Sequence, residues 1–408
     1  MTIDTPFTVD PVDGGITAPD GFRVAGVACG IKKTDSADLA LIVADNLATA
    51  AGMFTTNKAV AAPVTVCREH LDKSGGRVAA LVVNSGCANA CTGPQGLADA
   101  QEMATLTAAA VGCAPDHVLV ASTGVIGVNL KMAALRAGIP NAAAALSASG
   151  GAEAALAIMT TDPFPKSAAV EVVTAAGTFR VGGMTKGSGM IEPRMATMLG
   201  YLTTDAAVDP VRLRRVLVEA CRFTFNAITV DGEPSTNDCV FALANGASGV
   251  TIDDATEGAL FEGFRAVARE LALGIVRGGE GATKLVAITA SGAATDTDAW
   301  MAARAIANSL LVKTAIHGAD PNWGRLVAAA GRSGARFVLD RARVRIGDLV
   351  LFEDGRPFDE RAPQAAVYLQ GTDLAIDVNL GTGGSYTATV WTCDLSKMYV
   401  QINAEYRT

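Results

Sequence analysis

Short apolar runs bounded by polar turns recur along the first half of the chain. Runs of this kind, rich in valine, isoleucine and leucine, predict strands. We expect strands at 21–29, 39–44, 59–67, 77–83, 117–121, 167–173 and 178–183. Two longer stretches predict helices: apolar residues recur at helical spacing within 95–111, and alanine-rich sequence fills 131–159.

The second half continues with both kinds of element. Asp209-Pro210 is typical of a helix start, because aspartate caps the first turn and proline suits its first position. Further helices are expected at 254–276 and 298–310, and strands at 226–231, 239–244 and 285–290. Beyond Ser291 the sequence becomes more polar. We therefore place a domain boundary between a main domain, 1–290, and a smaller domain, 291–408.

The composition favours a large apolar core and argues against polyanionic partners. The chain has 408 residues, of which 50% are apolar, and its net charge is −8. This charge argues against nucleic acid and anionic membranes as partners. The acidic N-terminus lacks the basic and apolar regions of a signal sequence, and polar residues interrupt the apolar stretch 142–159. We expect a cytoplasmic protein with no nucleic-acid or membrane partner.

The residue types that usually hold metals are scattered along the chain. Among the eight cysteines only Cys87 and Cys91 are close, and neither they nor the three histidines have zinc-ligand spacing. The glycine-rich segment 278–284 ends in Thr283-Lys284, but it lacks the spacing of a phosphate-binding loop. The sequence therefore predicts no metal site.

The stretch 186–205 joins a glycine loop to an apolar run in which Thr197 follows the small residue Ala196. The Thr197 hydroxyl could attack the Ala196 carbonyl and move the acyl group from nitrogen to oxygen. Hydrolysis of that ester would make Thr197 a new N-terminus. Its amino group, with a reference pKa of about 7.7–8, could then act as the base for the hydroxyl of the same residue. An Ala-Thr pair alone is usually only part of a strand, so the prediction depends on its surroundings.

Those surroundings resemble the processing site of the glutamate N-acetyltransferase/ornithine acetyltransferase family of arginine biosynthesis. The resemblance rests on Lys186-Gly187-x-Gly189-Met190, on Met195-Ala196-Thr197-Met198-Leu199 and on Thr203-Thr204-Asp205. Further matching segments follow in order along the chain: 84–93, 121–127, 159–162, 228–238, 313–325 and 399–408. Two positions differ from the family pattern, Arg194 and Glu233-Pro234, and we expect any effect of Arg194 to be on the rate of cleavage.

The resemblance assigns roles to particular residues. It implies that the Thr123 hydroxyl and the Gly124 N–H stabilise the oxyanion of acyl transfer, where a lost donor can cost about 100- to 1,000-fold in rate. It implies that Thr197 is the nucleophile and, as an amine, the base. The implied substrate-binding residues are Thr160, Lys186, Thr197, Glu280, Asn403 and Thr408.

The resemblance also implies a fold and an assembly. The expected fold is a layered α-β-β-α sandwich of the type found in self-cleaving aminopeptidases and ornithine acetyltransferases. A smaller C-terminal α/β domain would follow, whose tail returns to the active site. Cleavage would give an α chain, 1–196, and a β chain, 197–408, and two of each are expected to assemble.

The implied reaction moves the acetyl group from N2-acetyl-L-ornithine to L-glutamate through an acetyl ester on Thr197. It predicts ping-pong kinetics, and it needs neither a metal nor a bound cofactor. Whether acetyl-CoA is a second acetyl donor is left open. Two alternatives remain at this point: a self-processed aminopeptidase or amidohydrolase, which uses water as acceptor, and an uncut binding protein without catalysis.

Overall fold

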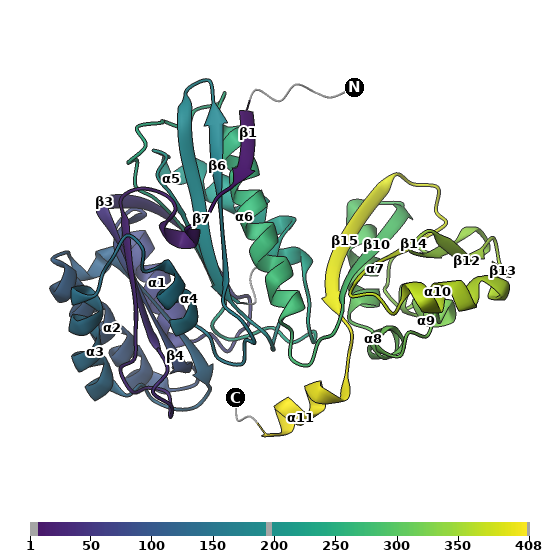
Figure 1. Ribbon diagram of the computed structural model, residues 1–408, viewed down its shortest axis with the longest axis horizontal. Helices are drawn as coiled ribbons and strands as arrows, with labels where there is room; N and C mark the ends of the chain where they lie inside the picture. The colour runs from purple at the N-terminus through teal and green to yellow at the C-terminus, as the bar shows by residue number, and fades with distance from the viewer. Residues whose placement is uncertain (1–6, 193–197, 406–408) are drawn as a thin grey trace.

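The computed structural model describes residues 7–192 and 198–405 (Figure 1). Over these residues the strands form two sheets. The larger, nine-stranded sheet contains β1 (Phe7–Pro11), β2 (Phe22–Val27), β3 (Leu39–Phe54), β4 (Arg77–Cys87), β5 (Val118–Val125), β6 (Lys166–Thr174), β7 (Gly177–Lys186), β8 (Leu199–Thr204) and β9 (Cys239–Ala244). The six-stranded sheet contains β10 (Leu285–Ala293), β11 (Arg343–Ile346), β12 (Leu349–Glu353), β13 (Arg356–Pro357), β14 (Asp373–Asn379) and β15 (Tyr386–Cys393).

The α-helices of the described residues divide between the two sheets. Those before β10 are α1 (Ala62–Lys73), α2 (Gly93–Val111), α3 (Met132–Ala144), α4 (Gly151–Ala157), α5 (Pro210–Arg222) and α6 (Glu257–Arg277). Those after β10 are α7 (Asp296–Ala307), α8 (Leu310–His317), α9 (Trp323–Gly331), α10 (Ala362–Tyr368) and α11 (Lys397–Glu405).

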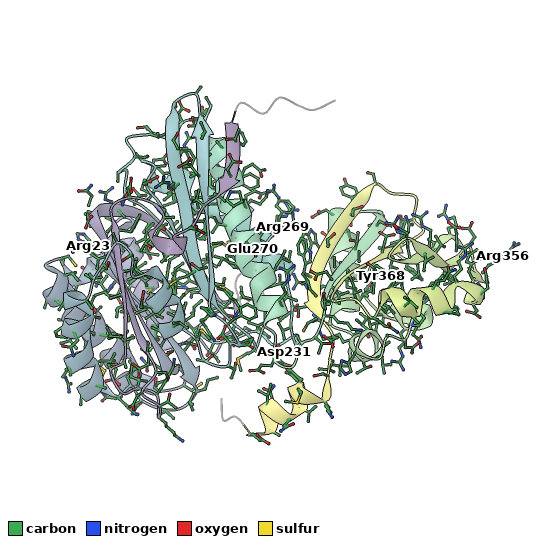
Figure 2. All side chains as sticks on the ribbon, viewed as in Figure 1. Arg23, Asp231, Arg269, Glu270, Arg356 and Tyr368 are labelled. Carbon is green, nitrogen blue, oxygen red and sulfur yellow. The ribbon has the colours of Figure 1, made fainter. Side chains whose placement is uncertain are left out.

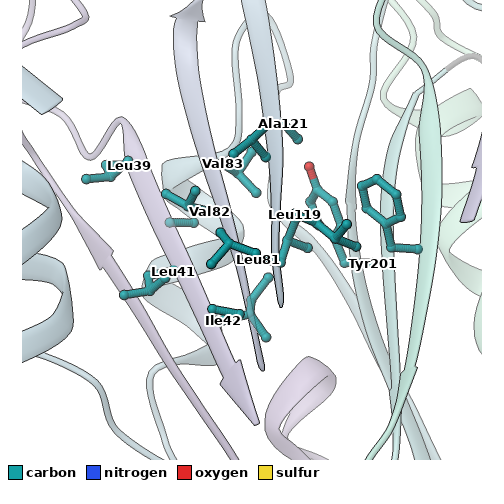
Figure 3. Close-up of a cluster of buried hydrophobic side chains, with 14 of the residues drawn as sticks. Leu39, Leu41, Ile42, Leu81, Val82, Val83, Leu119, Ala121 and Tyr201 are labelled. Carbon is teal, nitrogen blue, oxygen red and sulfur yellow. The ribbon is translucent and has the colours of Figure 1, made fainter. Parts of the chain in front are cut away.

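The long strand β3 joins the two halves of the larger sheet. Its first half pairs with β2 and β4, the register shifts between Val43 and Ala48, and its second half pairs with β9. One hydrophobic core lies between α1–α4 and strands β2–β5 (Figure 3), and another lies between α5, α6 and strands β6–β9. Helices thus cover the sheet from both sides (Figure 1), and the predicted layered α/β fold is confirmed.

The smaller sheet has its own core, formed with α7, α8, α9 and α10. Strand β10, next to the edge strand β15, pairs in parallel with β14 and antiparallel with β15. The predicted boundary after residue 290 falls inside β10, so the structural change from one sheet to the other lies closer to residue 284. The division of the chain into two domains stays a prediction. Among the described residues, no helix is long and apolar enough to cross a bilayer.

Two predicted strands are wrong. Residues 62–67 of the predicted strand 59–67 belong to helix α1, whose first turn contains Pro63, and whose buried residues Val64, Cys67 and His70 recur at helical spacing. Residues 226–231 form no strand: a short 3-10 turn, Phe225–Ala227, and irregular chain take its place. The β-branched residues of both segments suggested strands, but neither segment alternates between buried and exposed positions.

Candidate active site

A cavity of about 170 Å³ lies at the ends of strands β5, β7 and β8, between them and the C-terminal helix α11. Strand ends, loops and α11 all contribute to its wall, and these segments are far apart in the sequence. Six of the residues singled out from the sequence line it together: Thr123, Gly124, Thr160, Lys186, Glu280 and Asn403. Their roles in binding or chemistry stay predictions, but the fold brings all six to one place.

Thr123 and Gly124 lie near the end of β5, beside β4. Gly124 has a φ of +129°, and a Cβ atom there would lie 2.4 Å from the carbonyl carbon of Gly86, so only glycine fits. Lys186, the last residue of β7, donates a hydrogen bond of 3.2 Å from Nζ to the Thr123 hydroxyl. The contact places a positive charge next to the hydroxyl that was predicted to face the oxyanion.

Asp162 ties two walls of the cavity together. Its Oδ1 atom accepts hydrogen bonds of 2.7 Å from both Lys166 Nζ and the Gly187 N–H, and its Oδ2 accepts one of 3.1 Å from the Thr160 N–H. The side chains of Asp162 and Lys166 are almost fully buried. Burial alone would raise the pKa of Asp162, but the charges of Lys186 and Lys166 lower the pKa by more. The carboxylate therefore stays charged and fixes both chain segments. The sequence reasoning gave it no role.

Asp231 holds the other end of the glycine loop. Its carboxylate accepts hydrogen bonds from the N–H groups of Met190, at 2.7 Å, and Ile191, at 2.8 Å. It also accepts one of 3.2 Å from the Tyr399 hydroxyl of α11. Figure 2 shows Asp231 near the centre of the molecule, above α11. Burial, followed by the charge of Asp231, raises the pKa of Tyr399. The sequence reasoning missed both residues, although Asp231 lies in a segment that matches the family.

The C-terminal helix reaches the cavity through Asn403. Its Nδ2 atom donates a hydrogen bond of 2.7 Å to Oε2 of Glu280, which is itself buried. The Glu280 N–H donates to the Ser188 carbonyl at 2.9 Å, so Glu280 is also fixed to the glycine loop. A Cβ atom on Gly189 would lie 2.4 Å from Glu280 Oε2, which means that the loop and the carboxylate are in close contact.

Three of the predicted residues, Ala196, Thr197 and Thr408, lie outside the described residues, as does Arg194. Of the described residues on either side of the predicted cleavage point, Ile191 and Met198 line the cavity. No group of three or more His, Cys, Asp or Glu side chains among the described residues is placed to hold a metal ion.

Comparison with known proteins points to one family. The model of the ArgJ family matches residues 23–408. The chain is 50% identical over 402 residues to the arginine biosynthesis bifunctional protein ArgJ of Symbiobacterium thermophilum, covering 97% of this chain and 99% of that protein. It is 48% identical over 410 residues to the protein of that name from a Synechococcus species, covering 97% and 98%.

One solved structure that the chain is similar to is also from this group of enzymes by its name. The ornithine acetyltransferase of Mycobacterium tuberculosis, crystallised with ornithine, is 42% identical. The match covers 46% of this chain and 100% of that chain, with a TM-score of 0.43.

Proposed function

The chain belongs to the ArgJ family, and on that premise we propose that it moves an acetyl group from N2-acetyl-L-ornithine to L-glutamate through an ester on Thr197. One observation carries the proposal beyond the family. Residues from five segments singled out in the sequence, between Thr123 and Asn403, line a single cavity of about 170 Å³.

In the first half-reaction, Thr197 Oγ attacks the acetyl carbonyl and the Thr197 amine takes the hydroxyl proton. Negative charge then develops on the carbonyl oxygen, where the Thr123 hydroxyl and the Gly124 N–H stabilise it. Lys186 Nζ, bonded to Thr123, adds a positive charge to that side of the cavity. The bond from the carbonyl carbon to nitrogen then breaks, the protonated Thr197 amine gives its proton to the departing nitrogen of ornithine, and the acetyl group remains on Thr197 Oγ.

In the second half-reaction, the amine of glutamate attacks the acetyl ester, the bond from the acetyl carbon to Thr197 Oγ breaks, and a proton from the glutamate nitrogen restores the Thr197 hydroxyl. Both substrates carry an α-carboxylate, which Lys186 binds as a point charge, and Thr160 lines the same cavity. Glu280 accepts a hydrogen bond from the amine of the substrate or of Thr197, and Asn403 holds Glu280 in place. Thr408 completes the substrate site in this proposal.

The enzyme matures by cleavage between Ala196 and Thr197, and the α and β chains assemble two by two in the cytoplasm. No step needs a metal or a bound cofactor, since the base and the nucleophile belong to one threonine. Whether acetyl-CoA is a second donor depends on whether its acetyl group can reach the same ester, and a donor panel decides it.

Two measurements test the proposal. Denaturing mass spectrometry of the purified protein should show two fragments that divide before Thr197, and a single uncut chain for Thr197→Ala. The wild type should form acetylglutamate from acetylornithine and glutamate, whereas Thr197→Ala should form none. Transfer by that variant would falsify the assignment of the nucleophile.

The acceptor separates the transferase from a hydrolase. Acetylornithine should be consumed slowly without glutamate and rapidly with it, and initial rates at several concentrations of both substrates should give parallel lines in double-reciprocal plots. Acetate release that does not depend on glutamate would favour a hydrolase instead. The same assay with acetyl-CoA as donor tests for a second activity.

A further inference from the structure

Asp238 is a buried acid of the cavity that the mechanism above does not use. It lies directly before β9, lines the cavity and is 2% exposed. Its Oδ2 atom has no hydrogen-bond partner among the residues that the structure describes. Buried polar atoms of folded proteins are nearly always paired, so an unpaired carboxyl oxygen at a cavity wall indicates a function.

The backbone of Asp238 is anchored by contacts of the loop before β9. The preceding residue, Asn237, donates hydrogen bonds from Nδ2 to the carbonyls of Ala88, at 2.6 Å, and Ser122, at 2.8 Å. The Asp238 carbonyl accepts from the Thr55 N–H at 2.9 Å. These contacts fix the backbone that carries the Asp238 side chain.

The surroundings favour the protonated form of the carboxyl. Burial raises the pKa of Asp238 well above its ordinary value, and this effect outweighs the hydrogen bonds from Ser235 and the positive charge of Lys186, which lower the pKa. The next residue, Cys239, is a buried thiol whose own pKa is raised by burial. A protonated carboxyl can give a proton to one atom and take one from another.

The strand register places Asp238 beside Met198, the first described residue after the predicted cleavage point. Strands β8 and β9 run in parallel with Leu199 opposite Cys239, and the Cys239 N–H donates to the Met198 carbonyl at 3.0 Å. Asp238 therefore lies beside Met198, the residue that follows Thr197 in the sequence. Both Asp238 and Met198 line the cavity.

The uncut chain lacks the base of the mature enzyme. Before cleavage the nitrogen of Thr197 is a peptide amide, which cannot accept the hydroxyl proton. Some other group must therefore move protons during self-cleavage. We propose that Asp238 is this group, the acid–base residue for cleavage between Ala196 and Thr197. This inference rests on the function proposed above, because it explains how the nucleophile of that function is formed.

The other titratable side chains of the cavity are already engaged or are open to solvent. Lys186 bonds to the Thr123 hydroxyl. Asp231 accepts three hydrogen bonds, one of them from Tyr399.

The remaining two titratable side chains of the cavity, Glu280 and Glu233, are acidic. Glu280 accepts a hydrogen bond from Asn403, and Glu233 is exposed. Among the described cavity residues, Asp238 thus combines a buried carboxyl with a free oxygen.

The step balances without any co-reactant. A bond forms between Thr197 Oγ and the carbonyl carbon of Ala196, and the bond from that carbon to nitrogen breaks. The Asp238 carboxyl gives its proton to the departing nitrogen and takes the proton of the Thr197 hydroxyl. Water then hydrolyses the ester to a carboxylate on Ala196 and a free hydroxyl on Thr197.

The test follows cleavage of the full chain made by cell-free translation, sampled over time by denaturing mass spectrometry. Asp238→Asn keeps the shape of the side chain but cannot transfer a proton, so the rate of cleavage should fall about 100-fold or more. The matched control is Asp99→Asn. Asp99 is also a buried aspartate, but it accepts a hydrogen bond of 2.7 Å from the Gln95 side chain and does not line the cavity. This control should cleave at the wild-type rate.

A second variant keeps the proposal testable if Asp238→Asn does not fold. Ser235 lies in a partly exposed loop and its hydrogen bonds lower the pKa of Asp238, so Ser235→Ala should raise that pKa further. The acid form would then persist to higher pH, and the high-pH fall of the cleavage rate should shift upward relative to the wild type.

The outcomes separate the two proposals. Cleavage of folded Asp238→Asn at the wild-type rate, or identical pH profiles for Ser235→Ala and the wild type, overturns the role of Asp238. A wild type that stays uncut yet transfers acetyl groups overturns the proposed function itself. Cleavage lost in both Thr197→Ala and Asp238→Asn, but not in Asp99→Asn, supports both proposals.

Discussion

Arg304 of α7 donates a hydrogen bond of 2.8 Å to Oε1 of Glu192, whose side chain is 4% exposed. Asn308, just after the same helix, donates one of 3.0 Å to Oε2. These contacts join the smaller sheet and its helices to the last described residue before the predicted cleavage point. The C-terminal part of the chain therefore helps to position Glu192.

We expect Arg304→Ala to reduce the free energy of unfolding by about 3 kcal/mol, because Glu192 stays buried without its charged partner. It should also slow the formation of the two fragments, since Glu192 loses one of its two anchors. Urea unfolding and the mass-spectrometric time course measure the two effects.

The matched control is Arg136→Ala. The ion pair between Arg136 and Glu102 is solvent-exposed, so its loss should change stability little and cleavage not at all. Equal stability of the Arg304→Ala and Arg136→Ala proteins would contradict the positioning role of Arg304.

Asn403 provides the second prediction. Its hydrogen bond to Glu280 is made to a carboxylate, a type worth about 1.5–3 kcal/mol, so Asn403→Ala should lower kcat/KM by roughly tenfold or more. Asn403→Asp should lower it further, because two carboxylates would then face each other. Gln401→Ala, an exposed position on the same helix, serves as the control and should leave kcat/KM unchanged. Wild-type kinetics in the aspartate variant would show that the C-terminal helix does not act on Glu280.

The elements that the sequence predicted well are those whose signal is local. The strand predicted at 239–244 has the bounds of β9, because a continuous apolar run there is enclosed by polar residues. Helix α5 begins at Pro210, and Asp209 caps it by accepting from the Arg212 N–H. Strand β3 was only partly predicted, since its second half, rich in alanine and glycine, has low intrinsic strand preference.

The residues of the site could be predicted only where a recognisable sequence motif includes them. Asp162 and Asp231 accept hydrogen bonds from N–H groups of the glycine loop that lie 25 and 41 residues away in the sequence. No rule of residue spacing predicts such contacts. Glu192 was visible in the central motif, but its partner Arg304 lies 112 residues further along the chain. Hydrogen bonds between distant segments depend on how the whole chain packs, and a local sequence pattern gives no information about that packing.

Asp162 gives a prediction about pH. The pKa of Asp162 is lowered in the folded protein, so its contribution to stability is complete above its unfolded pKa of about 3.9 and is lost as the pH falls through the lower folded value. At pH 7, Asp162→Asn should be less stable than the wild type by about 3 kcal/mol, because Lys166 stays buried without its partner. This difference should shrink between about pH 4 and pH 2.

Urea unfolding at neutral and acidic pH measures that difference. The control is Glu171→Gln, whose ion pair with Arg180 is more exposed and should matter less at either pH. A stability loss in Asp162→Asn that is the same at pH 7 and at acidic pH would exclude a charged Asp162 as its cause.

The last prediction concerns the contact between the glycine loop and Glu280. A Cβ atom on Gly189 would lie 2.4 Å from Glu280 Oε2, so Gly189→Ala must displace that carboxylate from Asn403. The displaced group is the end of a flexible side chain, so stability should change little, whereas KM should rise by about tenfold through loss of the charged hydrogen bond.

Gly331→Ala is the matched control for this variant. Gly331 is the last residue of α9, where a Cβ atom meets nothing within 4 Å, so alanine should fit there without effect on KM. Steady-state kinetics and thermal unfolding of both variants distinguish a local displacement from a general loss of structure. If Gly189→Ala lowers the melting temperature together with the activity, the defect comes from a general loss of structure. If the variant keeps both its melting temperature and the wild-type KM, Glu280 does not belong to the substrate site.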